Sequence, residues 1–176
     1  SLLPPMVNLI AAYLVIQSNG QAAWGAFVEV LIFISITGMF LSFGLKDYVL
    51  REASIKPQSL YSLAKSAIAT RLFLLLIGIL VAFTLFSWQT AIWLTLWLTA
   101  QWIYTGMDPL VNFEKKFFVA TIAELLAGVG LIAFLLASNA DSTQLVGVFS
   151  IAAIVKSIVL LGYFSTKLKA EKASIN

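Results

Sequence analysis

The chain has no cysteine and no histidine, and only 11% of its residues are charged, against about 25% in a soluble domain. The missing cysteine excludes disulfides and thiolate metal sites, and the missing histidine excludes imidazole acid–base chemistry. Phosphate-binding loops, nucleophile elbows and dinucleotide fingerprints are also absent. We therefore expect no enzyme, no cofactor, no bound metal and, with a net charge of only +3, no nucleic-acid partner.

Hydrophobic residues make up 61% of the chain and form six long runs. A membrane span needs about 20 apolar residues, and lipid offers no partner for free backbone groups, so runs of this length predict transmembrane helices. We expect an all-α, polytopic membrane protein with six helices in one bundle. The predicted spans cover about 2–17, 22–43, 63–86, 91–107, 117–137 and 145–164.

Basic residues follow the runs in a regular way. Ten of the eleven lie in alternate gaps, whereas the gaps 17–21, 87–90 and 138–143 contain none. This is the positive-inside pattern, and it predicts that both termini are cytoplasmic in a multi-pass protein of the cytoplasmic (inner) membrane. The basic residues in the gaps are Lys46, Arg51, Lys56, Lys65, Arg71, Lys115, Lys116, Lys167, Lys169 and Lys172.

Two inner connections show further helical signals. Before the third span, Leu60, Ala64 and Ala67 share one face of an amphipathic helix, which we expect to lie partly in the inner interface before the chain enters the membrane. Before the fifth span, Asp108 and Pro109 suit the N-cap and first position of a separate short helix.

Three ionisable residues lie inside predicted spans, where a charge costs a few kcal/mol unless it meets a partner or a cavity. Glu124 and Lys156 both lie about 10–12 Å from the inner boundary at 1.5 Å per residue, so the two antiparallel spans can pair them. The pair is either a simple ionic link between helices or part of a polar transport cavity. Glu29 lies near the outer start of the second span, and it either faces a water-filled cavity or reaches up toward solvent.

Two stretches carry a family resemblance. In residues 19–54, Gly20 and the Trp24–Gly25 pair form the outer turn, and a Gly44–Leu45 pair followed by the basic residue of Arg51–Glu52 ends the second helix. The connection MDPLVNFEKKFFVAT, residues 107–121, follows an aliphatic, polar, basic, Phe order. These stretches resemble the polysaccharide-flippase branch of the multidrug/oligosaccharidyl-lipid/polysaccharide exporter superfamily.

The resemblance implies a membrane transporter that moves a lipid-linked oligosaccharide or polysaccharide precursor through a cavity between two six-helix bundles. It makes Glu29, Glu124 and Lys156 candidates for substrate binding or coupling. Lys46 and Arg51 become candidates for the cytoplasmic mouth, where the alternative is topology determination and contact with anionic lipid. Members of that family have twelve or fourteen helices, so we expect a fragment or half of one, with membrane lipid, the glycan substrate and a second bundle or other membrane subunit as partners. The alternative function is a non-transporting scaffold or accessory subunit of a larger membrane assembly.

Overall fold

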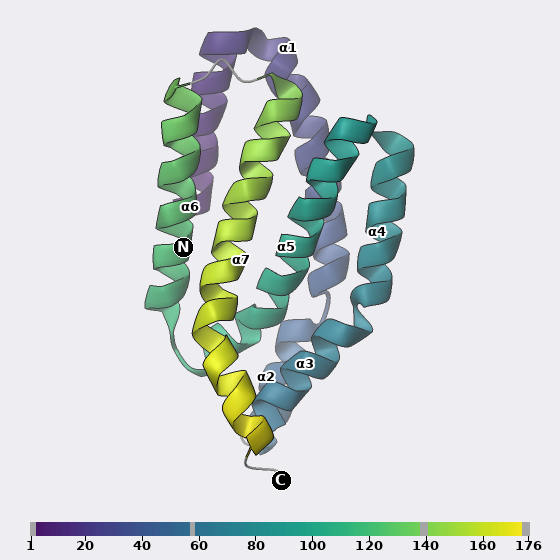
Figure 1. Cartoon of the computed structure of the whole chain (residues 1–176), viewed down its shortest axis with the longest axis vertical. Coiled ribbons are helices and arrows are strands. Elements are labelled where there is room, and N and C mark those ends of the chain that lie inside the picture. Colours follow the sequence, from purple (N-terminus) through teal and green to yellow (C-terminus); the bar gives the residue numbers. More distant parts are fainter. Residues whose placement is uncertain (1–2, 57–58, 138–140, 174–176) are drawn as a thin grey trace.

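A computed structural model describes residues 3–56, 59–137 and 141–173, and all the regular structure in these ranges is helical. The helices pack into one elongated bundle (Figure 1). They are α1 (Leu3–Ser42), α2 (Leu45–Ile55), α3 (Leu60–Thr70), α4 (Leu72–Leu85), α5 (Trp88–Phe113), α6 (Phe117–Ala137) and α7 (Ser142–Ala173).

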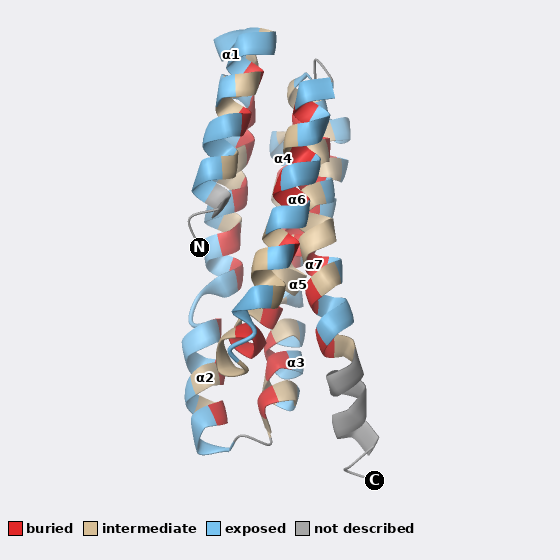
Figure 2. Cartoon of the chain, turned by 90° about the vertical axis from the view of Figure 1, so that its left-hand side faces the viewer, coloured by how far each residue is buried: buried red, intermediate tan, exposed pale blue. Residues whose placement is uncertain are grey.

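Four helical stretches in the described part of the chain are long and apolar enough to cross a membrane, which supports a multi-pass membrane protein. Large apolar side chains cover the outside of the bundle: Leu9, Leu80 and Phe118 are each at least 69% exposed. Figure 2 shows buried residues along the inward faces of the helices and exposed ones along the outward faces. An apolar exterior of this extent suits lipid rather than water. The four stretches are Pro5–Ile55, Leu60–Leu85, Phe117–Ala137 and Ser142–Ser165.

Helix α1 is bent sharply at Gly20, which has φ 79° and ψ 172°. This conformation is almost restricted to glycine, because a Cβ atom would clash with the backbone. The two limbs, residues 3–19 and 21–42, run in opposite directions and meet at the top of the bundle in Figure 1. They coincide closely with the first two predicted spans.

The predicted span 63–86 consists of two helices that meet at Arg71. Helix α3 is amphipathic as expected, with Leu60, Ala64 and Ala67 buried. The Arg71 guanidinium spans this break and the one between α1 and α2: its Nη2 donates to the Phe43 carbonyl at 2.8 Å. Gly44, the next residue, has φ 65°. One side chain therefore joins two helix breaks that lie at the same level of the bundle.

The sequence-based boundary after the fourth span is wrong. Asp108 and Pro109 do not begin a separate helix but lie inside α5, which continues to Phe113. Pro109, Leu110 and Val111 are buried, and this burial holds the last turns together although proline removes one backbone hydrogen bond. The turn into α6 is made by Lys115, with φ 55°.

The interior has two hydrophobic cores. The larger joins α1 and α4 to α5, α6 and α7, and contains the closely packed rings of Phe27, Trp97 and Phe149. The smaller joins α2 and α3 to the last turns of α5 and the second half of α7, around Val49, Leu110 and other residues. Tyr61 of α3 also donates to the Glu114 carboxylate.

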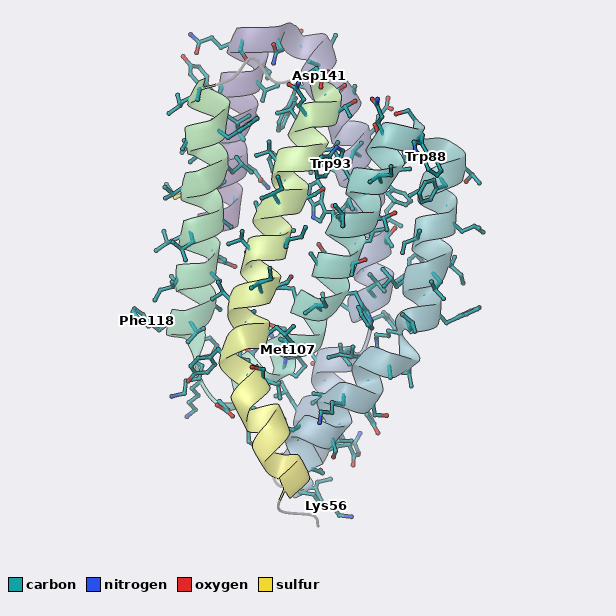
Figure 3. All side chains as sticks on the ribbon, viewed as in Figure 1. Lys56, Trp88, Trp93, Met107, Phe118 and Asp141 are labelled. Carbon is teal, nitrogen blue, oxygen red and sulfur yellow. The ribbon has the colours of Figure 1, made fainter. Side chains whose placement is uncertain are left out.

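The two ends of the bundle differ in charge. The basic end comprises α2, α3 and the α5–α6 turn, and its described residues include Lys46, Arg51, Lys56, Lys115 and Lys116. The opposite end comprises the bend of α1 and the α4–α5 turn, and we call it the neutral end because these two segments contain no Lys or Arg. Trp88 and Asp141 lie near it, opposite Lys56 (Figure 3). Helix α7 runs toward the basic end, but the side chains of Lys167, Lys169 and Lys172 lie outside the described part.

Candidate functional site

A partly buried ion pair lies between α6 and α7. Lys156 Nζ is 3.9 Å from Glu124 Oε1, and the two side chains are 26% and 13% exposed. The pairing predicted from equal depth is therefore present. It arises because α6 and α7 are antiparallel neighbours, so residues at equal distances from their connection lie side by side. Whether these two residues bind substrate or couple transport stays a prediction.

Tyr104 of α5 completes this polar group. Its ring lies under the Lys156 ammonium, 4.5 Å from Nζ to the ring centroid, which is within the range of a cation–π interaction. Its hydroxyl is 3.5 Å from Glu124 Oε1, the long limit of a hydrogen bond. The three side chains therefore balance one another's charge and polar groups through long contacts, inside a largely apolar bundle.

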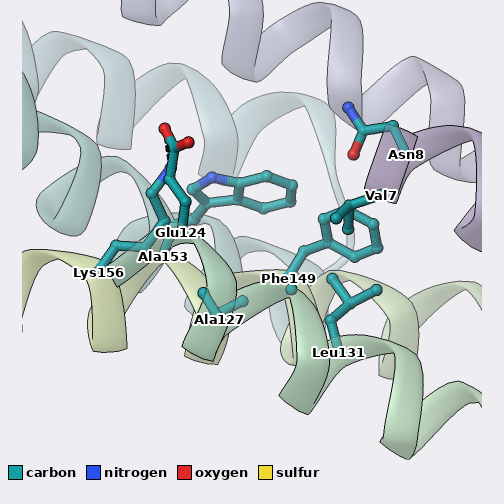
Figure 4. A pocket seen from close by; sticks show the side chains of 11 residues that line it. Val7, Asn8, Glu124, Ala127, Leu131, Phe149, Ala153 and Lys156 are labelled. Carbon is teal, nitrogen blue, oxygen red and sulfur yellow. Dashed lines mark ion pairs between the residues drawn. The ribbon is translucent and has the colours of Figure 1, made fainter. Parts of the chain in front are cut away.

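The ion pair borders a cavity of about 140 Å³ between α1, α5, α6 and α7 (Figure 4). Asn8 of α1 provides a further polar group on its wall, and Trp97 and Phe149 provide aromatic surface. Gly128 lets the first limb of α1 approach α6 closely, because a Cβ atom there would be 2.9 Å from Val7 Cγ2. The site is therefore shaped by four helices from distant parts of the chain.

Two more cavities lie nearer the basic end and share wall residues with this one or with each other. A cavity of about 160 Å³ shares Trp97, Ala153 and Lys156 with the first and adds Gln101 and Tyr104. A larger cavity of about 430 Å³ shares Tyr104 with the second and is lined by Lys46 and Asp108 among others. Lys46 Nζ is 3.3 Å from Asp108 Oδ2, and both side chains are partly exposed.

The other predicted site residues lie elsewhere. Arg51 is exposed on α2 and lines none of these three cavities, whereas Lys46 lines the largest. Glu29 is exposed on the second limb of α1, closer to the bend than to Lys46 along the chain, and it lines none of the three either. The roles assigned to Glu29 and Arg51 stay predictions.

Sequence reasoning did not single out Gln101, Tyr104 or Asp108 as members of this site. Their spacing of three and four residues places them on one face of α5, and that polar stripe on an otherwise apolar helix is the signal that identifies them. Taken alone, Tyr104 suggests an aromatic residue at the membrane interface, because that is where tyrosine is commoner in a membrane helix.

The described residues contain no group of three or more acidic side chains that could hold a metal ion. The cavities beside the ion pair are smaller than the roughly 300–1,000 Å³ of typical ligand sites, so they suit ions and water rather than an oligosaccharide. The chain matches no family model, and comparison with curated proteins and with solved structures also finds no match.

Proposed function

We propose that this chain is one six-span bundle of a membrane transporter that moves a lipid-linked oligosaccharide or polysaccharide precursor across the cytoplasmic membrane. In this proposal the two limbs of α1, the α3–α4 pair, α5, α6 and α7 each cross the membrane. The basic end then faces the cytoplasm, in keeping with the positive-inside rule. The sequence resemblance to polysaccharide flippases supports the choice of substrate.

The Glu124–Lys156 pair carries the proposal. Two opposite charges inside apolar helices cost free energy that a leucine pair would not, and such residues commonly mark the path of a substrate or ion. The pair borders a cavity instead of being packed tightly on all sides.

A second bundle is part of this proposal. Neither cavity beside the ion pair is large enough for a lipid-linked glycan, so the main passage has to form between this bundle and another one. Glu29 supports a contact of this kind, because its carboxylate lies on the exposed face of α1 between apolar residues such as Ile32. A polar group supplied by a neighbouring bundle would lower the cost of that charge in lipid.

The exposed apolar surface also favours a second candidate, a scaffold or accessory subunit that joins a larger membrane assembly without transporting anything. In that case Glu124 and Lys156 serve only to hold α6 and α7 together. Replacing either residue in a scaffold would lower the stability of the protein, whereas replacing it in a transporter would also lower export. Measuring both quantities separates the two functions.

The test compares export of surface polysaccharide in cells that carry Lys156→Ala, Glu124→Gln and the charge exchange Glu124→Lys/Lys156→Glu in the intact protein. We expect Lys156→Ala to lower export at least about tenfold, the effect of 1.4 kcal/mol, at unchanged protein levels. Lys116→Ala is the matched control, because it removes the same charge from an exposed turn at the basic end.

Export that survives in Lys156→Ala at normal protein levels would argue for the scaffold. If the exchanged pair is present at normal protein levels but export stays low, Lys156 acts at its own position. Export that returns to normal in the exchanged pair would show that the pair only links the helices.

A further inference from the structure

We infer that the three cavities form one water-filled vestibule that admits small cations from the basic end of the bundle to the Glu124–Lys156 pair. The cavities share wall residues in sequence: Tyr104 borders the first and second from the basic end, and Lys156 borders the second and third. Their volumes decrease inward, from about 430 Å³ to about 160 Å³ and about 140 Å³. The largest of the three cavities therefore lies at the basic end.

Polar groups occur along the whole of this path. Lys46 and Asp108 lie at the wide end, Gln101 and Tyr104 lie in the middle, and Asn8 lies beside the last cavity. Water in a protein cavity needs polar partners, and empty cavities are mostly apolar. These polar groups therefore provide partners for water in each of the three cavities.

The neutral end of the path is closed by aromatic rings. Phe149 precedes Lys156 by seven residues on α7, and Trp97 precedes Tyr104 by seven on α5, so each lies about 10 Å nearer the neutral end. Phe27 packs against both, with ring centroids 4.7 Å from Phe149 and 6.4 Å from Trp97. All three rings are at most 8% exposed. These rings close the path toward the neutral end.

The charges at the wide end select the sign of the solute. Lys46, Asp47 and Asp108 line the largest cavity, so carboxylates outnumber ammonium groups there. Lys46 is already engaged by Asp108 at 3.3 Å. The lining of this cavity therefore differs from the basic end as a whole: its own net charge is negative, which favours cations over anions. Small monovalent cations are therefore the class of solute that reaches Glu124.

This inference goes beyond the proposed transport activity and does not depend on it, because a one-sided vestibule can be measured without any substrate. Only the assignment of the basic end to the cytoplasmic side of the membrane rests on the proposed function. Failure of the accessibility test leaves the export experiment unaffected, and loss of the transport proposal leaves the vestibule intact.

The test uses single cysteines, for which a chain without native cysteine is well suited. Ala153→Cys places a thiol on the wall of the two inner cavities, whereas Ala123→Cys is a matched control beside Glu124, at a position that is 0% exposed and absent from the three cavity walls. The probes are two small membrane-impermeant thiol reagents, a methanethiosulfonate with a trimethylammonium group and one with a sulfonate group. Each is added to sealed vesicles with either the basic or the neutral end outward.

With the basic end outward, we expect the Ala153→Cys variant to react with the cationic reagent at least about tenfold faster than the Ala123→Cys variant, the rate ratio of a 1.4 kcal/mol difference. The cationic reagent should also react faster than the anionic one, and Asp108→Asn should reduce that preference.

Equal rates for the two variants, or a faster reaction when the neutral end faces outward, would overturn the inference. So would an Ala153→Cys variant that reacts with a lipid-soluble maleimide but with neither impermeant reagent. Ala100→Cys, on the wall of the middle cavity, and Ala91→Cys, buried near the neutral end, form a second pair if the first variant does not fold.

Discussion

Neighbouring side chains on α7 make two kinds of contact with α5, a cation–π contact and hydrogen bonds to backbone carbonyls. Lys156 faces the cavity and the Tyr104 ring, while its neighbour Ser157 is buried and donates its hydroxyl to the Ala100 carbonyl at 2.6 Å. About two turns toward the neutral end, Ser150 donates to the Trp93 carbonyl at 2.8 Å. The serines therefore fix α7 against α5 in the position that brings Lys156 to its partners.

Replacing Ser157 with alanine should destabilise the bundle by about 0.6 kcal/mol and at most about 1.7 kcal/mol, the range measured for hydrogen bonds between membrane helices. The physical reason is the loss of the interhelical bond to the Ala100 carbonyl. Unfolding in mixed detergent micelles measures the effect. Ser165→Ala is the control, because the Ser165 hydroxyl donates only within its own helix, to Gly162. Equal effects of the two changes would show that the bond to Ala100 contributes nothing.

At this scale the sequence predicts charged pairs better than neutral polar sites. Glu124 and Lys156 stand out because charges are rare in lipid, and their equal depth leads directly to the pairing. Gln101 and Tyr104 carry no charge, and an isolated tyrosine has a common alternative place at the membrane interface. Their membership of the site depends on which face of α5 is turned inward, and packing with α1 and α7 decides that.

At the scale of the helices, the chain changes direction in α1 and between α3 and α4, and the local backbone differs at the two places. The change of direction in α1 depends on Gly20 alone, since no other residue of that helix has a non-helical conformation. The break between α3 and α4 involves no left-handed residue: Arg71 has φ −91° and ψ −2°, and its guanidinium donates to the Phe43 carbonyl.

Gly20→Ala should therefore destabilise the protein by about 1–3 kcal/mol, the cost of holding a non-glycine residue in this backbone region. Nothing lies within 4 Å of a Cβ atom at Gly20, so the backbone conformation and not crowding is the cause. Thermal unfolding in detergent checks the prediction. The comparison is Gly25→Ala, a helical position with the same open surroundings, which should be neutral or slightly stabilising. A neutral Gly20→Ala would mean that the bend is not held at that residue.

Sequence patterns predict the helices themselves well where hydrophobicity starts and stops abruptly. The span 117–137 has the same bounds as α6, because Lys116 and the polar residues after Ala137 limit it. The sequence does not predict the end of α5 correctly, because Asp108 and Pro109 resemble the start of a helix. The continuation of α5 is stabilised by the burial of Leu110 and Val111 in the second core.

The whole molecule consists of two cores of unequal size that meet at the level of the polar site. The larger core has an apolar exterior, whereas the smaller one is covered by the polar faces of α2 and α3 at the basic end. The sequence predicts the membrane class but not this division. Helices α1 and α7 are apolar on nearly all sides, so periodicity does not reveal which residues pack together.

The orientation of the whole bundle can be measured with two exposed positions. We expect Lys116→Cys to react with an impermeant maleimide only from the cytoplasmic side and Gln89→Cys only from the opposite side, because basic loops are retained in the cytoplasm. Labelling of intact cells, before and after permeabilisation, separates the two. Reaction of both variants from one side would contradict six crossings, and reversed labelling would contradict the cytoplasmic position of the termini.

The bond from Arg71 to the Phe43 carbonyl constrains how the chain can change in length. Deleting one residue between Gly20 and Phe43 would rotate the end of α1 by roughly 100° and point its carbonyl away from the guanidinium. An insertion between Leu60 and Arg71 would turn the guanidinium away in the same manner. The bond therefore couples the register of the second limb of α1 to that of α3, so that a change of length in either helix breaks the contact between the two.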